Sequence, residues 1–231
     1  MNEVLRQEKK FFIHQADAAV LRHQLGAVML RDAHNGAQGY RIRSLYFDTP
    51  DDEDFAAKVD GLELRRKLRL RIYSPAADFA MLEMKQKQGP YQRKRSLRVS
   101  REEAARLCRG DYRPLLDHPE DFAAECYALM HCRCYRPKVI VEYLRQAFIA
   151  RENHIRITLD GGIVATETCC DVFAPQLPMY PVLDPFRLVL EVKYNGFLLS
   201  YCKQLLDRVE RSELSVSKYC LARGVSLGSE G

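Results

Sequence analysis

The chain has 231 residues, of which 47% are hydrophobic and 29% are charged, and its formal net charge is +5. This composition is typical of a globular protein with one large or two small domains. It argues against a membrane-spanning protein, because no apolar run approaches the roughly 20 residues that a spanning helix requires. The modest net charge does not by itself indicate nucleic acid.

The N-terminal sequence MNEVLRQEKKFFI has no apolar core of the kind found in signal peptides. Eight cysteines lie at positions 108, 126, 132, 134, 169, 170, 202 and 220, and none forms a CxxC pair. His131, Cys132 and Cys134 are neighbours, but without a second pair they make a poor zinc site. We therefore expect reduced thiols in a cytoplasmic protein.

Hydrophobic periodicity predicts strands and helices that alternate along the first half of the chain. We expect a strand at 6–13, a helix at 17–30, a strand at 39–50 and a short helix at 51–61. Strands at 65–74, 79–88 and 91–99 follow directly, with the turn sequences SPAAD and QGP between them. This spacing predicts an antiparallel meander.

The second half continues the same alternation. A capping box of Ser100 and Glu103 predicts a helix at 100–109. Further expected elements are a helix at 119–131, strands at 136–149, 154–160 and 186–195, and helices at 197–210 and 217–223. We therefore predict a single α+β domain over residues 1–223 and a flexible tail at 224–231.

The strand at 65–74 has one charged face and one apolar face. Lys67, Arg69 and Arg71 alternate with leucine and isoleucine, so their side chains share a face. The same alternation gives a charged face to the residues Glu8 and Lys10, Arg41 and Arg43, Glu83, Lys85 and Lys87, Tyr143 and Arg145, Arg156 and Asp160, and Glu191 and Lys193.

Two arrangements explain such strands. A solvated outer face over a buried inner face is the default for antiparallel sheets. The alternative is a closed antiparallel β-barrel of about eight strands, with helices on its apolar outside and charges lining a tunnel. Isolated buried ions cost several kcal/mol each, so a charged tunnel would contain water and a polyanion. Guanidinium and ammonium groups suit phosphates, and sparse carboxylates suit a divalent ion that bridges them.

The chain resembles a known family in several short segments that occur in order over nearly its whole length. They are EKKFF (8–12), SLYFDTP (44–50), KLRLRIY (67–73), LEMKQK (82–87), QRKRS (92–96), VEYLRQAF (141–148), RITLD (156–160), LEVKYN (190–195) and SKYC (217–220). They are similar to segments of the triphosphate tunnel metalloenzymes, and more closely to the polyphosphate polymerase domain of the vacuolar transporter chaperone (VTC) type. CYTH-type relatives carry ExExK in the first strand, whereas this chain has Arg6, Glu8 and Lys10.

The resemblance implies roles for individual residues. It implies catalytic roles for Arg69, Arg71, Lys85, Arg145 and Arg156. It implies substrate-binding roles for Lys10, Lys94, Tyr143, Lys193, Ser217 and Lys218, and Mn²⁺ or Mg²⁺ bound by Glu191 and Glu8. The polymerases carry a lysine where this chain has Ser215, which puts acceptor binding or polymerase activity in question.

Four functions follow as hypotheses. The first is transfer of the ATP γ-phosphate to phosphate, pyrophosphate or polyphosphate, beside a membrane-protein partner at the inner face of a membrane. The second is a tunnel tripolyphosphatase or nucleoside triphosphatase, and the third is a non-catalytic module that binds polyphosphate or inositol phosphate. The fourth, single-stranded nucleic acid binding, ranks last because interleaved aromatic residues are missing from KLRLRIY.

Overall fold

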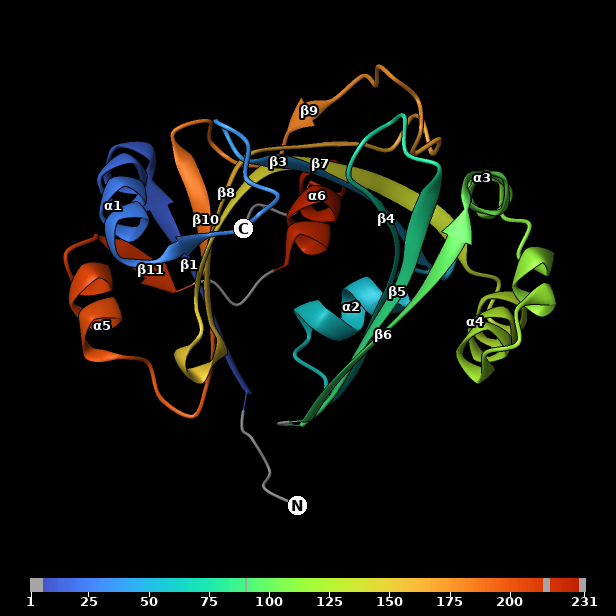
Figure 1. The fold of residues 1–231 in the computed structure, drawn as a ribbon. Helices are drawn as coiled ribbons and strands as arrows, with labels where there is room; N and C mark the ends of the chain where they lie inside the picture. Colours follow the sequence, from blue (N-terminus) through green and yellow to red (C-terminus); the bar gives the residue numbers. More distant parts are fainter. Residues whose placement is uncertain (1–5, 90, 214–216, 229–231) are drawn as a thin grey trace. The chain divides into compact units, whose positions relative to one another are not determined.

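The computed structural model describes residues 6–89, 91–213 and 217–228 (Figure 1). These residues divide into two compact units. Unit 1 contains the described residues within 1–41, 143–163 and 183–215. Unit 2 contains those within 42–142, 164–182 and 216–231.

Unit 1 is an antiparallel sheet with two helices. Its strands are β1 (Arg6–His14), β2 (Leu30–Arg31), β10 (Arg187–Asn195), β11 (Arg211–Glu213), most of β8 (Ile155–Thr166) and the second half of β7 (Arg136–Ala150). The strand order is β11-β1-β10-β8-β7, and β2 pairs with β7. The helices are α1 (Gln15–Val28) and α5 (Ser200–Asp207), with a 3₁₀ turn at Glu152–His154.

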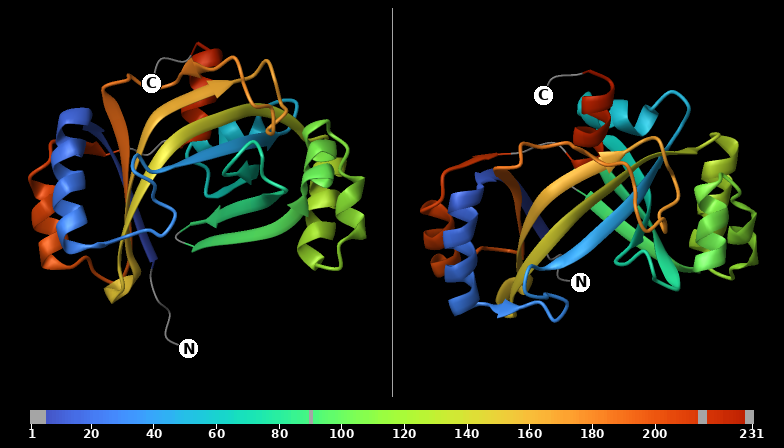
Figure 2. Two further views of the ribbon diagram at one scale, coloured as in Figure 1. Left: turned by 45° about the horizontal axis from the view of Figure 1, so that its top comes forward. Right: turned by 90° about the horizontal axis from the view of Figure 1, so that it is seen from above.

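The two helices cover the apolar face of this sheet, and Figure 2 shows both on the same side of β1. Leu21 and Leu25 of α1 and Leu206 of α5 belong to one buried cluster with Leu190 and Ile157 of the strands. Because side chains alternate along a strand, the charged residues of β1, β8 and β10 share the opposite face.

Unit 2 is a second antiparallel sheet with helices. Its strands are the first half of β7, most of β3 (Tyr40–Asp48), β4 (Leu64–Ile72), β5 (Phe79–Gln88) and β6 (Tyr91–Ser100), in the order β7-β3-β4-β5-β6. The short strand β9 (Tyr180–Pro181) pairs with the end of β8. The helices are α2 (Glu53–Val59), α3 (Arg101–Cys108), α4 (Asp121–Cys132) and α6 (Lys218–Ser226), with a 3₁₀ helix at Arg113–Asp117.

Helices α3 and α4 pack on the apolar face of β4, β5 and β6. Leu70, Leu82 and Leu97 lie in one buried cluster with Leu107 of α3 and Cys126 of α4. The predicted meander and the predicted capping box at the start of α3 are both confirmed. The cationic side chains of β4 therefore lie on the face away from these two helices.

The α+β class is confirmed, but the closed barrel is not. The hydrogen-bonded path begins at β11 and ends at β6, and within the described segments no ladder joins these two strands. The alternation of residues determines which face of a strand is apolar, but it carries no information about which edges pair. The prediction of one domain over 1–223 stays a prediction.

Most elements lie where the sequence predicted them, with shifted ends. The first helix ends at Val28, so Leu30 belongs to a strand, and α5 is shorter than the predicted helix at 197–210. Helix α6 continues to Ser226, into the segment expected to be a tail, whose residues 229–231 lie outside the described part. Among the helices within the described ranges, none combines the length and apolarity needed to cross a membrane.

Candidate functional site

In unit 2, one buried carboxylate lies among three cations, and we call this group the Glu83 cluster. The Glu83 side chain is 5% exposed, and Arg69 binds it from the neighbouring strand through Nε and Nη2, both at 2.8 Å. Arg71 Nη2 lies 2.8 Å from the same oxygen, and Lys94 Nζ donates to Oε1 at 2.5 Å. Three cations and one carboxylate give the cluster a formal charge of +2.

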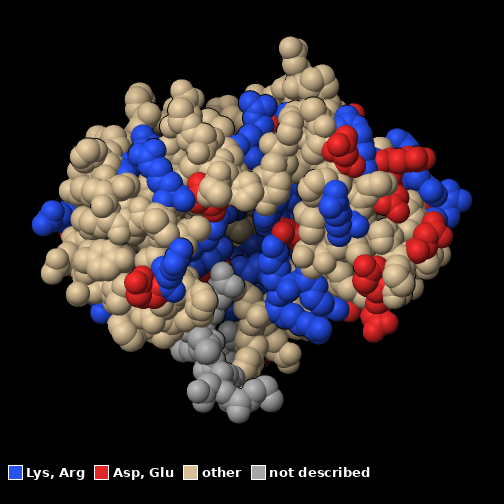
Figure 3. All heavy atoms as spheres, in the orientation of Figure 1, with Lys and Arg blue, Asp and Glu red and all other residues tan. Residues whose placement is uncertain are grey.

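Cross-strand register places two further lysines, Lys67 and Lys85, in a row with Lys94 of this cluster. Lys67, Lys85 and Lys94 lie directly opposite one another on β4, β5 and β6. They are on the same face as Arg69 and Glu83, one pair of residues further along the strands. Figure 3 shows Lys and Arg side chains gathered over β5 and β6. Like charges directly opposite one another are unfavourable in a sheet, so this row favours a bound anion.

The cations of the cluster keep Glu83 ionised. Burial alone would raise the pKa of Glu83, but the charges of Arg69 and Lys94 and their hydrogen bonds hold this pKa below its ordinary value. Arg69 also donates from Nη1 to the Tyr46 hydroxyl at 3.2 Å. Glu83 thus acts as the internal counterion of the cluster.

Ser217 and Lys218 lie at the start of α6. Ser217 is the N-cap, and its hydroxyl accepts a hydrogen bond from the Cys220 backbone N–H at 3.2 Å. Both residues are half-buried. The exposed N–H groups of a helix start favour anions, so this position is consistent with the predicted role of both residues. Ser215 lies outside the described residues.

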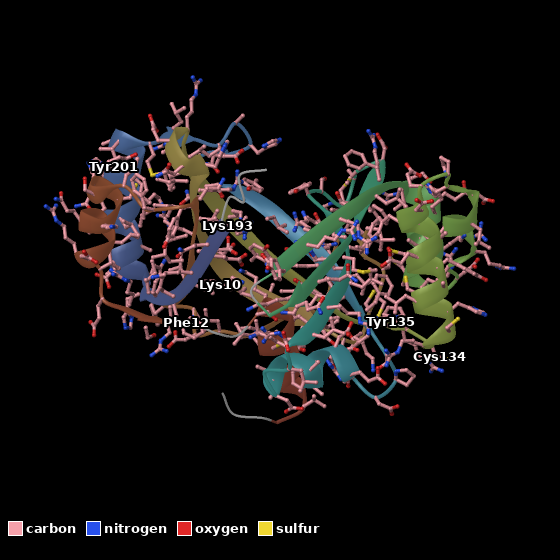
Figure 4. The ribbon with its side chains drawn as sticks, turned by 90° about the horizontal axis from the view of Figure 1, so that it is seen from below. Lys10, Phe12, Cys134, Tyr135, Lys193 and Tyr201 are labelled. Carbon is pink, nitrogen blue, oxygen red and sulfur yellow. The ribbon has the colours of Figure 1, made fainter. Side chains whose placement is uncertain are left out.

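In unit 1, Glu8, Lys10, Glu191 and Lys193 lie together on the polar face, and with Arg145 and Asp160 they form what we call the Glu191 cluster. Lys10 Nζ lies 2.8 Å from Glu8 and 3.7 Å from Glu191, and Lys193 Nζ lies 3.1 Å from Glu191. Figure 4 shows Lys10 and Lys193 on the adjacent strands β1 and β10. Strand pairing sets Glu8 opposite Lys193 and Lys10 opposite Glu191.

Arg145 joins two carboxylates of this cluster. Its Nε and Nη2 donate to the two oxygens of the fully buried Asp160 at 2.6 and 2.7 Å, and Nη2 also lies 3.4 Å from Glu191. Its guanidinium lies 5.4 Å from the centre of the buried Tyr143 ring. The cluster holds three cations and three carboxylates, so its formal charge is zero.

The carboxylates of Glu8 and Glu191 are neighbours, and the negative charge of Glu191 acts on the pKa of Glu8. Burial would raise the pKa of Glu191, but Lys193, Lys10 and Arg145 together hold it well below its usual value. For Glu8, burial and the neighbouring Glu191 act to raise the pKa, yet Lys10 and Lys193 leave it lowered. Both groups are therefore carboxylates at neutral pH.

A divalent ion fits this pair of oxygen ligands. Mg²⁺ is commonly bound through one or two carboxylates, with water and phosphate oxygens completing its shell. The buried Thr158 hydroxyl lies directly across from Glu191, and it has no hydrogen-bond partner among the described residues. Over the same residues, no group of three or more His, Cys, Asp or Glu side chains could hold a metal alone. The protein thus offers two ligands, and a substrate would supply others.

Arg156 lies directly across from Lys193 in the strand register, but its ion pair is with a carboxylate outside the Glu191 cluster. Its Nη2 lies 2.7 Å from Asp32 Oδ2 and donates to the Tyr40 hydroxyl at 3.1 Å. Asp32 also accepts a hydrogen bond from the His34 backbone N–H at 3.0 Å. Arg156 is therefore held at the edge of the polar face, next to the Glu191 cluster.

The structure distributes the predicted site residues over both units. Unit 2 contains Arg69, Arg71, Lys85, Lys94, Ser217 and Lys218, and unit 1 contains Glu8, Lys10, Tyr143, Arg145, Arg156, Glu191 and Lys193. The sequence did not assign roles to Asp32, Tyr46 and Asp160, which bind the arginines. The alternation of residues in its strand placed Asp160 on the charged face. Asp32 lies in a loop, where no periodic pattern indicates which residues lie in a site.

The chain is similar to several solved structures over most of its length. A protein from Bacillus halodurans described as a "putative adenylate cyclase" is 13% identical, with 88% of each chain covered and a TM-score of 0.49. A protein from Pyrococcus horikoshii OT3 is 11% identical, with 93% of this chain and 97% of that chain covered and a TM-score of 0.47.

No curated protein matches the chain. The model of the VTC domain matches residues 5–226, which is nearly the whole sequence. This match agrees with the resemblance carried by the short segments of the sequence. The chain therefore belongs to the VTC domain family.

Proposed function

We propose that this protein is a metal-assisted phosphotransferase that moves the γ-phosphate of ATP onto phosphate, pyrophosphate or polyphosphate. The observation that carries the proposal is the Glu83 cluster, within a chain that belongs to the VTC domain family. It combines two guanidinium groups and one ammonium group around one internal counterion. Proteins commonly bind phosphates with such groups.

The cations act by position and charge. Phosphoryl transfer needs no protein nucleophile, because an oxygen of the acceptor attacks the γ-phosphorus while the leaving oxygen departs with ADP. Arg69, Arg71, Lys85 and Lys94 bind the phosphate oxygens and stabilise the charge that spreads over them in the transition state. Bidentate arginines also fix the orientation of the phosphates.

The residues of unit 1 have complementary roles in this proposal. Arg145 and Arg156 bind and orient phosphate oxygens, with Lys10 and Lys193 as further cations and Tyr143 as an orienting neighbour of Arg145. Glu8 and Glu191 hold Mn²⁺ or Mg²⁺, which, when bound, neutralises phosphate charge. The Thr158 hydroxyl is placed to accept a hydrogen bond from water near Glu191.

Ser217 and Lys218 bind phosphate from the start of α6 in the same proposal. The absence of the family lysine at Ser215 lowers the affinity for the acceptor chain or the rate. ATP and pyrophosphate or polyphosphate are the proposed partners. The membrane-protein partner implied by the resemblance is not part of the proposal.

The test is incubation of the full chain with ATP and Mn²⁺, with the products separated by gel electrophoresis. Long phosphate chains are expected, and Arg69→Ala is expected to abolish them while the circular dichroism spectrum is unchanged. Orthophosphate as the sole product would instead establish a triphosphatase. If tripolyphosphate raises the melting temperature without any turnover, the domain is a binding module.

A further inference from the structure

Tyr219 and Arg223 attach helix α6 to buried or half-buried carboxylates of unit 2. Tyr219 is 1% exposed, and its hydroxyl donates to Asp48 Oδ2 at 2.6 Å. Arg223, one turn further along, pairs with Asp52 and Glu167, both at 2.5 Å. The first of these anchors follows Ser217 and Lys218 directly.

Asp48 is a fully buried carboxylate at the end of β3 that is held by hydrogen-bond donors. It accepts from the backbone N–H groups of Thr49 at 2.8 Å and of Asp54 and Phe55 at 2.9 Å. Two of these donors belong to the first turns of α2. The Tyr219 hydroxyl adds a fourth donor, so one carboxylate fixes α2 and α6 to the same strand end.

The ring of Tyr219 connects this anchor to the Glu83 cluster. It stacks on the ring of Tyr46 with centroids 5.1 Å apart and planes at 23°. The Tyr46 hydroxyl in turn accepts from Arg69 Nη1 at 3.2 Å. A continuous series of contacts therefore runs from the start of α6 to the arginine that binds Glu83.

We propose that Tyr219 and Asp48 are positioning residues that fix Ser217 and Lys218 relative to Arg69. This inference rests on the proposed function only in taking a polyphosphate as the ligand. Linked phosphates have fixed spacings, so groups that bind successive phosphates must be held at matching positions. A misplacement of about 1 Å can cost about 100-fold in the rate of a reaction whose groups must be aligned.

A purely structural role for this network predicts a different set of effects. Deletion of a buried tyrosine hydroxyl lowers the stability of the protein wherever it occurs. Tyr112 provides the matched control, because it is a buried tyrosine of unit 2 whose hydroxyl donates to the Tyr135 carbonyl at 2.6 Å. Tyr219→Phe and Tyr112→Phe each remove one hydrogen bond and keep the ring.

The experiment measures tripolyphosphate binding to the full chain by calorimetry. Tyr219→Phe is expected to weaken binding by roughly tenfold or more, and Asp48→Asn should do the same. Tyr112→Phe should stay within about twofold of the wild type, because Tyr112 belongs to the apolar cluster on the opposite face of β4 from Arg69 and Arg71. In a Lys218→Ala background, Tyr219→Phe should add little further loss, because it acts through the position of that lysine.

The inference is wrong if Tyr219→Phe binds tripolyphosphate with wild-type affinity, or if both tyrosine variants lose affinity equally. It is also wrong if the losses of affinity in Tyr219→Phe and Lys218→Ala are fully additive in the double variant. Hydrogen exchange of the amides of α6 distinguishes failure of this inference from failure of the proposed function. If the wild type does not bind tripolyphosphate, the proposed function fails. Faster exchange of α6 in Tyr219→Phe, but not in Tyr112→Phe, would then still support the anchor, and equal exchange would refute it.

Discussion

Replacement of Glu83 by glutamine tests whether this carboxylate is the internal counterion of a phosphate-binding face. Glutamine keeps the shape and one acceptor oxygen but removes the negative charge. The change leaves Arg69, Arg71 and Lys94 close together without the carboxylate that they surround. We expect a less stable protein in the absence of anions.

The magnitude follows from the burial of the partners. Breaking a buried ion pair by removing one member costs about 3–5 kcal/mol. Here Glu83 is 5% exposed, but Arg69 is 22% and Lys94 49% exposed, so solvent screens part of the repulsion. We therefore expect a loss of about 2 kcal/mol, which corresponds to a decrease in melting temperature of roughly 4–8 °C for a chain of this size.

Added anion should reverse this effect. Tripolyphosphate supplies the missing negative charge, so it should raise the melting temperature of Glu83→Gln more than that of the wild type. The lowered pKa of Glu83 means that its stabilisation is present above the ordinary pKa and lost as the pH falls below it. The variant should therefore lose less stability than the wild type on acidification to about pH 3.

The matched control is Glu125→Gln, which removes a carboxylate that pairs with Arg95 on the other face of the sheet. Glu125 is 44% exposed, so its loss should cost less than about 1 kcal/mol and show no added response to tripolyphosphate. Differential scanning fluorimetry with and without tripolyphosphate measures both variants. A Glu83→Gln protein as stable as the wild type without anions, or no greater response to the anion, would refute the counterion argument.

Three further predictions concern other parts of the chain. Burial raises the pKa of Asp54 to about 7, so this group destabilises the fold as the pH rises from about 4 to 7. Urea unfolding at pH 5 and pH 8 spans about two pKa units of this titration, so Asp54→Asn should remove about 3 kcal/mol of the pH dependence between them. The exposed Asp51→Asn is the control and should leave the dependence unchanged. Ser100→Ala removes the cap of α3 and should cost about 1 kcal/mol, seen as a lower urea midpoint. Glu191→Gln should abolish the additional rise in melting temperature that Mn²⁺ gives with tripolyphosphate, because one of two anionic ligands is lost.

The sequence predicted the faces of the strands well because burial imposes a period of two on each strand. Arg69 and Arg71 share a polar face, and Leu68 and Leu70 belong to the buried cluster with α3 and α4, as the alternation indicated. The closure of the sheet could not be predicted in the same way. Edge pairing depends on twist and on the lengths of distant strands, and neither leaves a local pattern.

The counterions of the site were harder to predict than its cations. Glu83 was one charged position among many, and only the strand register shows that it lies directly across from Arg69. Asp32 pairs with Arg156 from a loop more than a hundred residues away, and loop residues have no period. Partners that are distant in sequence are fixed by tertiary packing, which a single sequence does not reveal.

The charge balance of the two clusters supports the proposal that a divalent ion binds in one of them. The Glu83 cluster has a formal charge of +2, so in the proposed reaction it needs no metal to attract phosphate. The Glu191 cluster has three cations and three carboxylates, and this neutral group gains little from a polyanion alone. A divalent ion at Glu8 and Glu191 would give it the same +2 charge. The metal requirement of the proposed reaction should therefore arise in unit 1, and alanine variants of Arg69, Arg71 or Lys94 should weaken phosphate binding at every metal concentration.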